Sequence, residues 1–270
     1  HDYPLLRHVE ARFRLLVDAL AAETPDVAFL QEISISEAHG HLPNRLVAAL
    51  RDRRLDYEIA YAPANGSVAD GGNFEEGSAI LSRHPLTGCG VRRLAADRPV
   101  IRELHGYRFV EHRIALRATI QAPDGGPLDV FGIHLTDAPP VDGRAPRREQ
   151  IEDFERFVAE RPSRARPAIV AGDFNASPEA EEIRWLASRG LEDLGASHAA
   201  ATNDRNDRDL EARADTSDHR IDYVFGLAAG ETTVAPREAR SFLAAAAPTE
   251  TGGWLWASDH NGVVVDLEIV

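Results

Sequence analysis

Apolar residues recur at the spacing of an amphipathic helix in four stretches of the chain, with charged residues between them. These stretches predict helices over residues 8–22, 41–53, 147–161 and 177–190. In the last stretch we expect Ser177 to cap the helix, Pro178 to occupy its first position and Gly190 to follow its end.

Shorter apolar runs, bounded by turn residues, predict the strands. They cover residues 27–33, 55–63, 78–86, 112–136, 165–174, 220–226 and 262–270, and the glycine-rich residues 64–77 are expected to form a loop. The run over 112–136 is interrupted by Asp124-Gly125, which is a strong signal for a hairpin and therefore for antiparallel pairing. Because helices and strands mix along the whole length, we expect one α/β (α+β) domain over residues 1–270, a layered sandwich with mainly antiparallel sheets.

Polar residues stand at or near the ends of the predicted strands, where a buried run would continue apolar. They are Gln31 and Glu32, Glu75 and Glu76, His134, Asp173 and Asn175, Asp222, and Asp259 and His260. Each alone is compatible with a turn, a helix cap or a solvated strand end. Together they form an oxygen-rich set without a thiolate, which suits Mg²⁺ or Mn²⁺. Carboxylates, a hard cation and histidines can together hydrolyse a phosphoester. A zinc site is the alternative, although paired cysteines and an H-E-x-x-H motif are both absent.

Seven ordered fragments carry a resemblance to a known family: "PDVAFLQE", "EEGSAILSRHPL", "EHRIALRATI", "FGIHLTD", "IVAGDFNASP", "RIDYVF" and "SDHNGVVVDL". In this order and spacing they resemble the endonuclease/exonuclease/phosphatase superfamily of metal-dependent phosphoesterases. The resemblance implies a four-layer αββα sandwich, in which two β-sheets are flanked by helices, and Mg²⁺ or Mn²⁺ as the cofactor.

The same resemblance implies roles for individual residues. Glu32 and Asp259 correspond to the metal-binding acids. His134 and Asn175 correspond to phosphate-binding groups, and Asp173, with Asn175, orients or deprotonates the attacking water. His260 corresponds to the histidine that stabilises the pentacovalent phosphorus, and Asp222 to the carboxylate that orients it. Glu76 corresponds to an acid that pairs with His134, and Arg113 to a phosphate-facing or structural arginine. We expect the neighbouring carboxylates to raise the pKa of both histidines.

Two positions depart from the family pattern. The family begins with a strand that ends in a metal-binding asparagine, whereas this chain opens at "HDYPLLRHVEARF". We therefore expect the first N-terminal core strand to be missing from this chain. Ile133 stands where threonine is common, which is a conservative change within a strand.

Composition narrows the substrate class. The net charge is −14 and all 30 basic residues are arginine, so the molecule as a whole repels nucleic-acid backbones. We expect a phosphate-ester substrate that is a small molecule or a lipid headgroup; a metal-dependent DNA or RNA nuclease is the alternative. A binding module that retains the fold without catalysis is the second alternative, which the complete set of polar residues argues against.

Other features bear on location and assembly. No apolar run approaches the roughly 18 residues of a membrane helix, and we expect a monomer. Without any methionine, His1 is not a translated start, so both a cytoplasmic and a secreted location stay open. Cys89 is the single cysteine and is expected to be buried. The polar residues 202–218 are interpreted either as a surface loop or as a substrate-specificity loop.

Overall fold

The computed structural model describes residues 8–69, 72–95, 99–104, 107–123, 126–139, 146–198, 202, 219–249 and 252–270. The helices in these ranges are α1 (Val9–Glu23), α2 (Leu42–Asp52), α3 (Pro146–Ala159) and α4 (Glu181–Ser188). The strands are β1 (Val27–Ser36), β2 (Gly40–His41), β3 (Glu58–Ala69), β4 (Gly72–Ser82), β5 (Thr87–Arg93), β6 (Val100–Leu104), β7 (Tyr107–Glu111), β8 (Ile114–Ala122), β9 (Gly126–His134), β10 (Ala168–Asp173), β11 (Leu191–Asp193), β12 (Asp222–Leu227), β13 (Val234–Phe242), β14 (Ala247–Pro248), β15 (Trp254–Leu255) and β16 (Gly262–Ile269).

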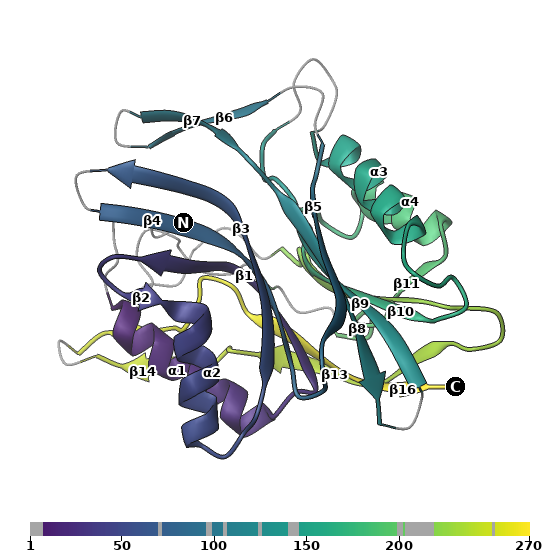
Figure 1. Cartoon of the computed structure of the whole chain (residues 1–270), viewed down its shortest axis with the longest axis horizontal. Helices are drawn as coiled ribbons and strands as arrows, with labels where there is room; N and C mark the ends of the chain where they lie inside the picture. The colour runs from purple at the N-terminus through teal and green to yellow at the C-terminus, as the bar shows by residue number, and fades with distance from the viewer. Residues whose placement is uncertain are drawn as a thin grey trace.

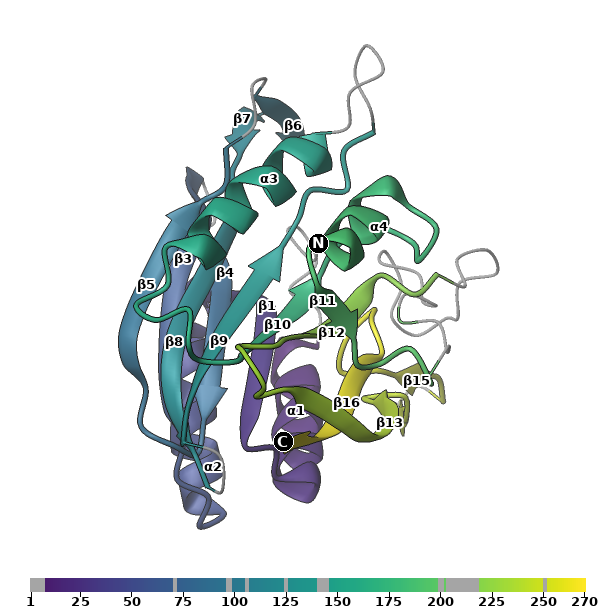
Figure 2. The same cartoon turned by 90° about the vertical axis from the view of Figure 1, so that its right-hand side faces the viewer.

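The elements form the expected four layers, with two β-sheets packed between helices (Figures 1 and 2). One sheet has the strand order β2-β1-β4-β3 and is covered by α1 and α2. The other has the order β11-β12-β10-β9-β8-β5 and is covered by α3 and α4. A third apolar cluster fills the space between the sheets. The α/β sandwich predicted from the sequence is therefore confirmed.

The β13–β16 pair extends the layer that contains β1. Val265 and Leu267 of β16 pack into the cluster between the sheets, and Phe242 of β13 packs against the cluster beneath α1 and α2. Among the described residues, β16 forms a ladder only with β13, so this pair does not continue the hydrogen bonding of the β1 sheet.

The predicted hairpin of β8 and β9 is confirmed, but the loop predicted over residues 64–77 is wrong. β3 and β4 extend through most of that segment and pair from Glu58↔Ser82 to Ala69↔Gly72, with a bulge between Pro63 and Asn65. A Cβ atom on Gly77 would lie 2.0 Å from the Ala62 carbonyl oxygen. The glycines therefore permit close backbone approach within a ladder.

The start of α4 also differs from the prediction. The helix begins at Glu181, and its N-cap, Ala180, makes no side-chain cap hydrogen bond. Ser177 instead belongs to a preceding turn, in which the Ala180 amide donates to its carbonyl oxygen over 2.9 Å. Glu181 and Glu182 in the first turn complement the helix dipole in place of a side-chain cap.

Several short or exposed strands were not predicted, namely β2, β5, β6, β7, β11, β13, β14 and β15. Cys89, expected to be buried, is exposed on the edge strand β5. Of the polar segment 202–218, only Thr202 lies within the described residues. In the described part of the chain, every helix is too short or too polar to span a membrane.

Candidate active site

Three neighbouring strands place their polar ends in line. In the six-stranded sheet, Asp173 at the end of β10 is the register partner of two residues. These are His134 on the parallel strand β9 and Asp222 on the antiparallel strand β12. These positions were separate in the sequence, but cross-strand partners lie only about 4.5–5.5 Å apart. Pairing of the backbone therefore brings a histidine and two carboxylates to one edge of the sheet.

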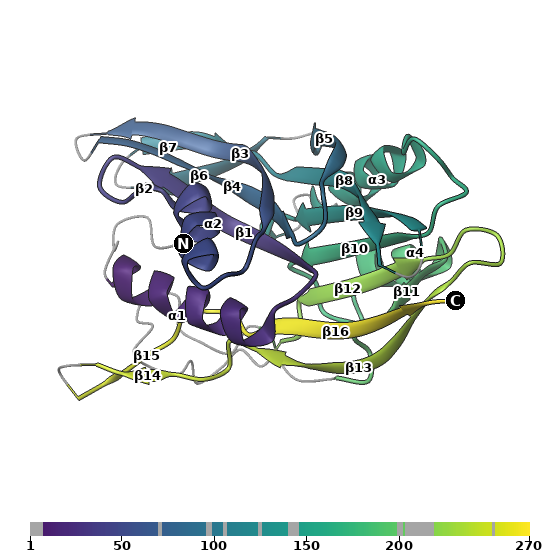
Figure 3. The ribbon, with the colours of Figure 1, turned by 60° about the horizontal axis from the view of Figure 1, so that its bottom comes forward.

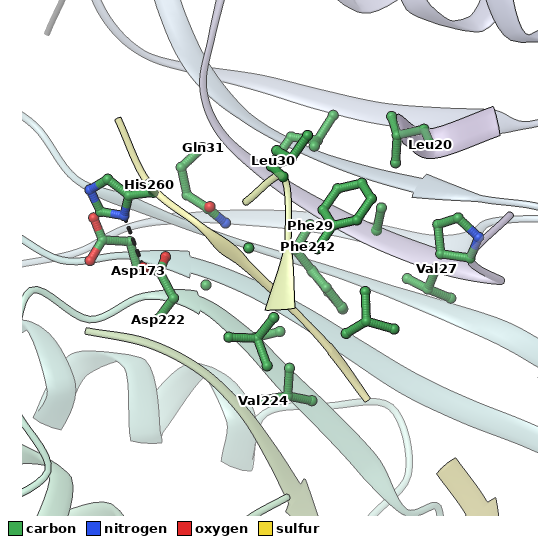
Figure 4. Close-up of a pocket in the computed structure, with 18 of the residues that line it drawn as sticks. Leu20, Val27, Phe29, Leu30, Gln31, Asp173, Asp222, Val224, Phe242 and His260 are labelled. Atoms are coloured by element: carbon green, nitrogen blue, oxygen red, sulfur yellow. Dashed lines mark hydrogen bonds and ion pairs between the residues drawn. The ribbon is translucent and has the colours of Figure 1, made fainter. Parts of the chain in front are cut away.

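His260 completes this group from the segment that enters β16. Its Nδ1 lies 2.9 Å from Oδ2 of Asp222, as the dashed line in Figure 4 shows. Burial alone would lower the pKa of His260, but the negative charge and hydrogen bond of Asp222, together with the charges of Asp173 and Asp259, outweigh burial and raise this pKa to about 10. The expected imidazolium is therefore present at neutral pH at this position.

Asp173 is buried and is surrounded by ionisable groups. Burial and the nearby charge of Asp222 raise the pKa of Asp173 to about 8. Asp173, Asp222 and His260 each offer one atom that could bind a metal ion, and these three atoms lie within 4.8 Å of one another. Two carboxylates this close together in a buried site repel each other, and a bound cation would reduce that repulsion.

Asn175 reaches Asp173 through a turn of the backbone. β10 ends at Asp173, and Asn175 adopts a left-handed backbone with φ of 48°, so the pair does not share an extended segment. The turn brings the Asn175 amide to 2.7 Å from Oδ1 of Asp173, and the side-chain Nδ2 donates to the Leu135 carbonyl over 2.8 Å. Phe174 between them is fully buried. Just before them, a Cβ atom on Gly172 would lie 1.9 Å from the Ile133 carbonyl oxygen, so the approach of β10 to β9 requires glycine.

The surroundings of His134 contradict the predicted imidazolium. Nη1 of Arg113 lies 2.9 Å from both ring nitrogens, and Oδ2 of Asp173 lies 3.5 Å from Nε2. Burial, together with the positive charge of Arg113, lowers the pKa of His134 well below its ordinary value. A neutral imidazole can accept a hydrogen bond from Arg113, whereas an imidazolium has no free acceptor. His134 is therefore neutral where His260 is charged.

A buried chain of polar groups lies behind His134. Arg113 is 3% exposed, and its Nη2 donates to Glu111 over 3.0 Å. Glu111 also accepts hydrogen bonds from Arg102 over 2.9 Å and from the Thr136 hydroxyl over 2.5 Å. The acid that fixes the arginine partner of His134 is therefore Glu111, two residues before Arg113.

Glu76 does not occupy the place that the resemblance implied. Its Oε1 accepts a hydrogen bond from Nδ2 of Asn65 over 3.2 Å, whereas His134 contacts Arg113 and Asp173. Burial and the charge of Glu32 raise the pKa of Glu76 to about 7. Asn65 in turn bonds both backbone polar groups of His112, which connects β3 to the segment that carries Arg113.

Glu32 and Asp259, the expected metal ligands, lie around one arginine of α1. Burial lowers the pKa of Arg12, while the charges of Asp259 and Glu32 act to raise it, so both acids lie within electrostatic reach of its guanidinium. Nε of Arg12 donates to the Ala257 carbonyl over 3.1 Å, beside Asp259. Glu32 has a left-handed backbone with φ of 54° and its Oε1 lies 3.9 Å from Arg113.

Thr202 was not predicted, yet it connects the two halves of the His260–Asp222 pair. Its hydroxyl accepts hydrogen bonds from the amides of Ile221 and Asp222 over 2.9 and 3.1 Å. Its carbonyl accepts from the amide of Asn261 over 2.6 Å. A threonine in a polar stretch carries no sequence signal for this role. Glu111 was more accessible to prediction, since it ends β7 only two residues before Arg113.

The polar residues of the site line one end of a cavity of about 1350 Å³; they include Glu32, His134, Asp173, Asp222, Asp259 and His260. Figure 4 shows its polar end, with Asp173, Asp222 and His260, and an apolar end near Val27 and Leu20. The polar end combines a charged histidine, a neutral histidine and several carboxylates in an open cleft. Such a set can bind an anionic group from one side and a cation from the other.

The architecture is the four-layer sandwich that the resemblance implied. The family profile described as "Endonuclease/Exonuclease/phosphatase family" matches residues 6–260. The chain belongs to that family. A search of curated proteins found no match.

Solved structures share the fold at low sequence identity. An endonuclease/exonuclease/phosphatase from Beutenbergia cavernae has a TM-score of 0.68 at 23% identity, and the match covers 96% of this chain and 66% of that one. An endonuclease/exonuclease/phosphatase family protein from Leptotrichia buccalis has a TM-score of 0.70 at 17% identity, with 98% and 96% covered. The mannosyl-6-phosphatase Bt3783 of Bacteroides thetaiotaomicron has a TM-score of 0.63 at 20% identity, with 97% and 91% covered. This chain thus spans slightly less than two thirds of the Beutenbergia protein.

Proposed function

We propose that this protein is a Mg²⁺- or Mn²⁺-dependent phosphoesterase that hydrolyses a small phosphomonoester or phosphodiester by in-line attack of water. The observation that carries the proposal is the convergence of His260–Asp222 with His134 and Asp173 at one end of an open cavity. A charged and a neutral histidine on the two sides of a buried carboxylate suit a reaction that both moves a proton and stabilises anionic oxygens.

Each group has a role that follows from its surroundings. His260, held as imidazolium by Asp222, donates a hydrogen bond to a phosphate oxygen as negative charge develops there. Asp173 in its ionised form accepts the proton of the attacking water, and Asn175 keeps that carboxylate oriented. His134 binds a phosphate oxygen as a neutral donor. Arg113, which is buried against Glu111, positions His134 and does not contact substrate.

The donor set fits a hard cation. Glu32 and Asp259 would hold it, since both carboxylates already share the field of one cationic side chain, Arg12, and no thiolate is nearby. When bound, the cation neutralises phosphate charge and lowers the pKa of coordinated water.

The acidic surface supports a small substrate. The net charge of −14 opposes the approach of a long polyanion, whereas a single phosphate group is recognised by the local site. The Bacteroides protein of the same fold is a mannosyl-6-phosphatase, which is consistent with small phosphomonoesters as a substrate class.

The test uses p-nitrophenyl phosphate and bis-p-nitrophenyl phosphate with Mg²⁺, with Mn²⁺ and with EDTA. We expect turnover that EDTA abolishes and that either cation restores. His260→Ala and Asp173→Ala should each lower kcat by about 10²–10³-fold, as is typical for loss of one transition-state contact. His198→Ala is the matched control, because the ring of this half-buried histidine lies 2.7 Å from the Ser241 hydroxyl and does not line the cavity.

Two results would decide against the proposal. Absence of cation-dependent turnover on both esters would leave a non-catalytic binding module. Turnover of DNA or RNA that exceeds ester turnover, and whose affinity falls steeply with salt, would identify a nuclease instead.

A further inference from the structure

The wall of the cavity beside His134 carries an exposed carboxylate, that of Asp137. Asp137 lines the same cavity as the catalytic groups, and its side chain is 47% exposed. Its backbone is held in place from the preceding residue, because the amide of the buried Thr136 donates to Oε1 of Gln150 over 3.0 Å. The roles proposed above for the catalytic groups do not use this carboxylate.

The β6–β7 hairpin fixes the Asp137 side chain. The hairpin lies at the end of the molecule where β3 turns into β4 (Figures 1 and 3). Its register pairs Arg102 with Phe109 and Val100 with Glu111. Arg102 and Glu111 are therefore diagonal neighbours on one face of the hairpin. From there the Arg102 guanidinium reaches both acids: Nε donates to Glu111 over 2.9 Å, and Nη2 donates to Oδ1 of Asp137.

Asp137 is separated from the phosphate-binding histidine by a single guanidinium group. Its Oδ1 lies 3.8 Å from Nη2 of Arg113, and Nη1 of the same arginine lies 2.9 Å from the ring nitrogens of His134. The contacts of Asp137 with Arg102 and Arg113 both involve Oδ1, and Oδ2 forms no hydrogen bond with the residues that the structure describes. One carboxylate oxygen is thus anchored, and the other is available beside the place where a phosphate binds.

We infer that Asp137 determines leaving-group specificity by accepting hydrogen bonds from hydroxyl groups on the alcohol part of the phosphoester. This inference rests on the proposed phosphoesterase function and narrows its substrate to the phosphoester of a polyol, such as a sugar phosphate. An ionised carboxylate only accepts hydrogen bonds, so its partners on a ligand are donors such as hydroxyls. Because Asp137 is anchored before a ligand arrives, it loses little conformational freedom on binding.

The charges around Asp137 disfavour other leaving groups. Two arginines, Arg102 and Arg113, are paired here with two carboxylates, so this wall has no surplus positive charge for a second phosphate. A polyphosphate or a nucleic acid would bring its own negative charge next to Asp137, which is unfavourable. An apolar tail would remove water from the carboxylate without supplying a hydrogen-bond donor. A neutral group with several hydroxyls incurs neither penalty.

Binding without turnover tests the inference. Isothermal titration calorimetry in EDTA compares glucose 6-phosphate with ethyl phosphate, which has the same phosphate group and no hydroxyl. We expect the parent protein to bind glucose 6-phosphate about tenfold or more tightly, and Asp137→Ala to lose this preference, because the hydrogen bonds involve a charged acceptor. Asp18→Ala is the matched control, since Asp18 is also an exposed carboxylate paired with an arginine, Arg53, but does not line the cavity.

Kinetics with Mg²⁺ supply the second measurement. The ratio of kcat/KM for glucose 6-phosphate to kcat/KM for p-nitrophenyl phosphate should fall by about tenfold or more in Asp137→Ala and stay unchanged in Asp18→Ala. An Asp137→Ala variant that keeps the parent's ratio would overturn the inference and leave the phosphoesterase function standing.

The binding measurement separates the failure of this inference from the failure of the proposed function. A parent protein that binds the two ligands equally, or binds neither, would overturn the inference, and so would a preference that survives in Asp137→Ala. Absence of turnover, together with a binding preference that is lost in Asp137→Ala, would overturn the phosphoesterase function and retain Asp137 as the residue that recognises the hydroxyl groups.

Discussion

His260 and Asp222 lie 2.9 Å apart between Nδ1 and Oδ2, although 38 residues separate them in the chain. Asp222 begins β12 and His260 stands just before β16, so the pair exists only because these two strands meet at the edge of the sandwich. The carboxylate holds the imidazole in its charged form against the effect of burial, and this charge is central to the proposed chemistry.

Replacing Asp222 by asparagine should lower the pKa of His260 from about 10, because burial is then opposed only by the weaker influence of Asp173 and Asp259. Titration of the His260 ring proton by NMR measures this change directly. We expect kcat on p-nitrophenyl phosphate at neutral pH to fall by about 10²–10³-fold with little change in KM. An unchanged titration midpoint would show that Asp222 does not determine the charge of His260.

Replacing Glu111 by glutamine should destabilise the fold and alter His134. Glu111 and Arg113 are a buried ion pair, with side chains 5% and 4% exposed, and loss of one partner of such a pair costs about 3–5 kcal/mol. Urea unfolding measures the loss. The control is Glu152→Gln, which removes an exposed (i,i+4) partner of Arg148 and should cost less than about 1 kcal/mol. Equal effects of the two changes would contradict the buried role of Glu111.

Replacing Thr202 by valine should weaken the link between Asp222 and His260. Valine keeps the shape but leaves the amides of Ile221 and Asp222 without their acceptor, and each unsatisfied buried group costs about 1–3 kcal/mol. Thr202→Ser retains the hydroxyl and is the matched control. We expect the valine variant to lower both the unfolding free energy and kcat, and the serine variant to restore kcat. If valine and serine behave alike, the hydroxyl is not the group that matters.

The stability of the cation-free protein should fall as the pH rises from about 5 to 9. The pKa of Asp173 in the folded protein, about 8, is above its ordinary value of 3.8, so its contribution is fully present below that ordinary value and is lost as the pH rises toward 8. The pKa of His260, about 10 against 6.5, has the same sign, and its contribution is lost between those values.

Urea unfolding in EDTA across this range measures the trend. Asp173→Asn removes the group whose pKa is about 8, so the decline between pH 5 and 8 should become less steep, while the parts of the decline due to Glu76 and, at higher pH, to His260 persist. A slope that is the same in the variant and the parent would exclude Asp173 as its cause.

Much of the fold could be read from the chain because the signals were local. The helical spacing of apolar residues predicted α1, α2 and α3, and Asp124-Gly125 predicted the β8–β9 hairpin. The misjudged parts involve backbone contacts that residue type alone does not reveal. Gly77 suggested a loop, but its lack of a side chain allows β4 to approach Ala62. Ser177 suggested a helix cap, but its carbonyl accepts a hydrogen bond from the Ala180 amide in a turn, and the helix begins only at Glu181.

The sequence by itself determined which residue types are available for the chemistry and roughly where strands end, since these depend on side-chain type and on local periodicity. Only the tertiary structure decided how those residues act on one another. Register between β9, β10 and β12 brings His134, Asp173 and Asp222 together, and burial beside Arg113 keeps one histidine neutral while Asp222 keeps the other charged. Charge states in a buried site depend on desolvation and on neighbours from other strands, which no local stretch of sequence contains.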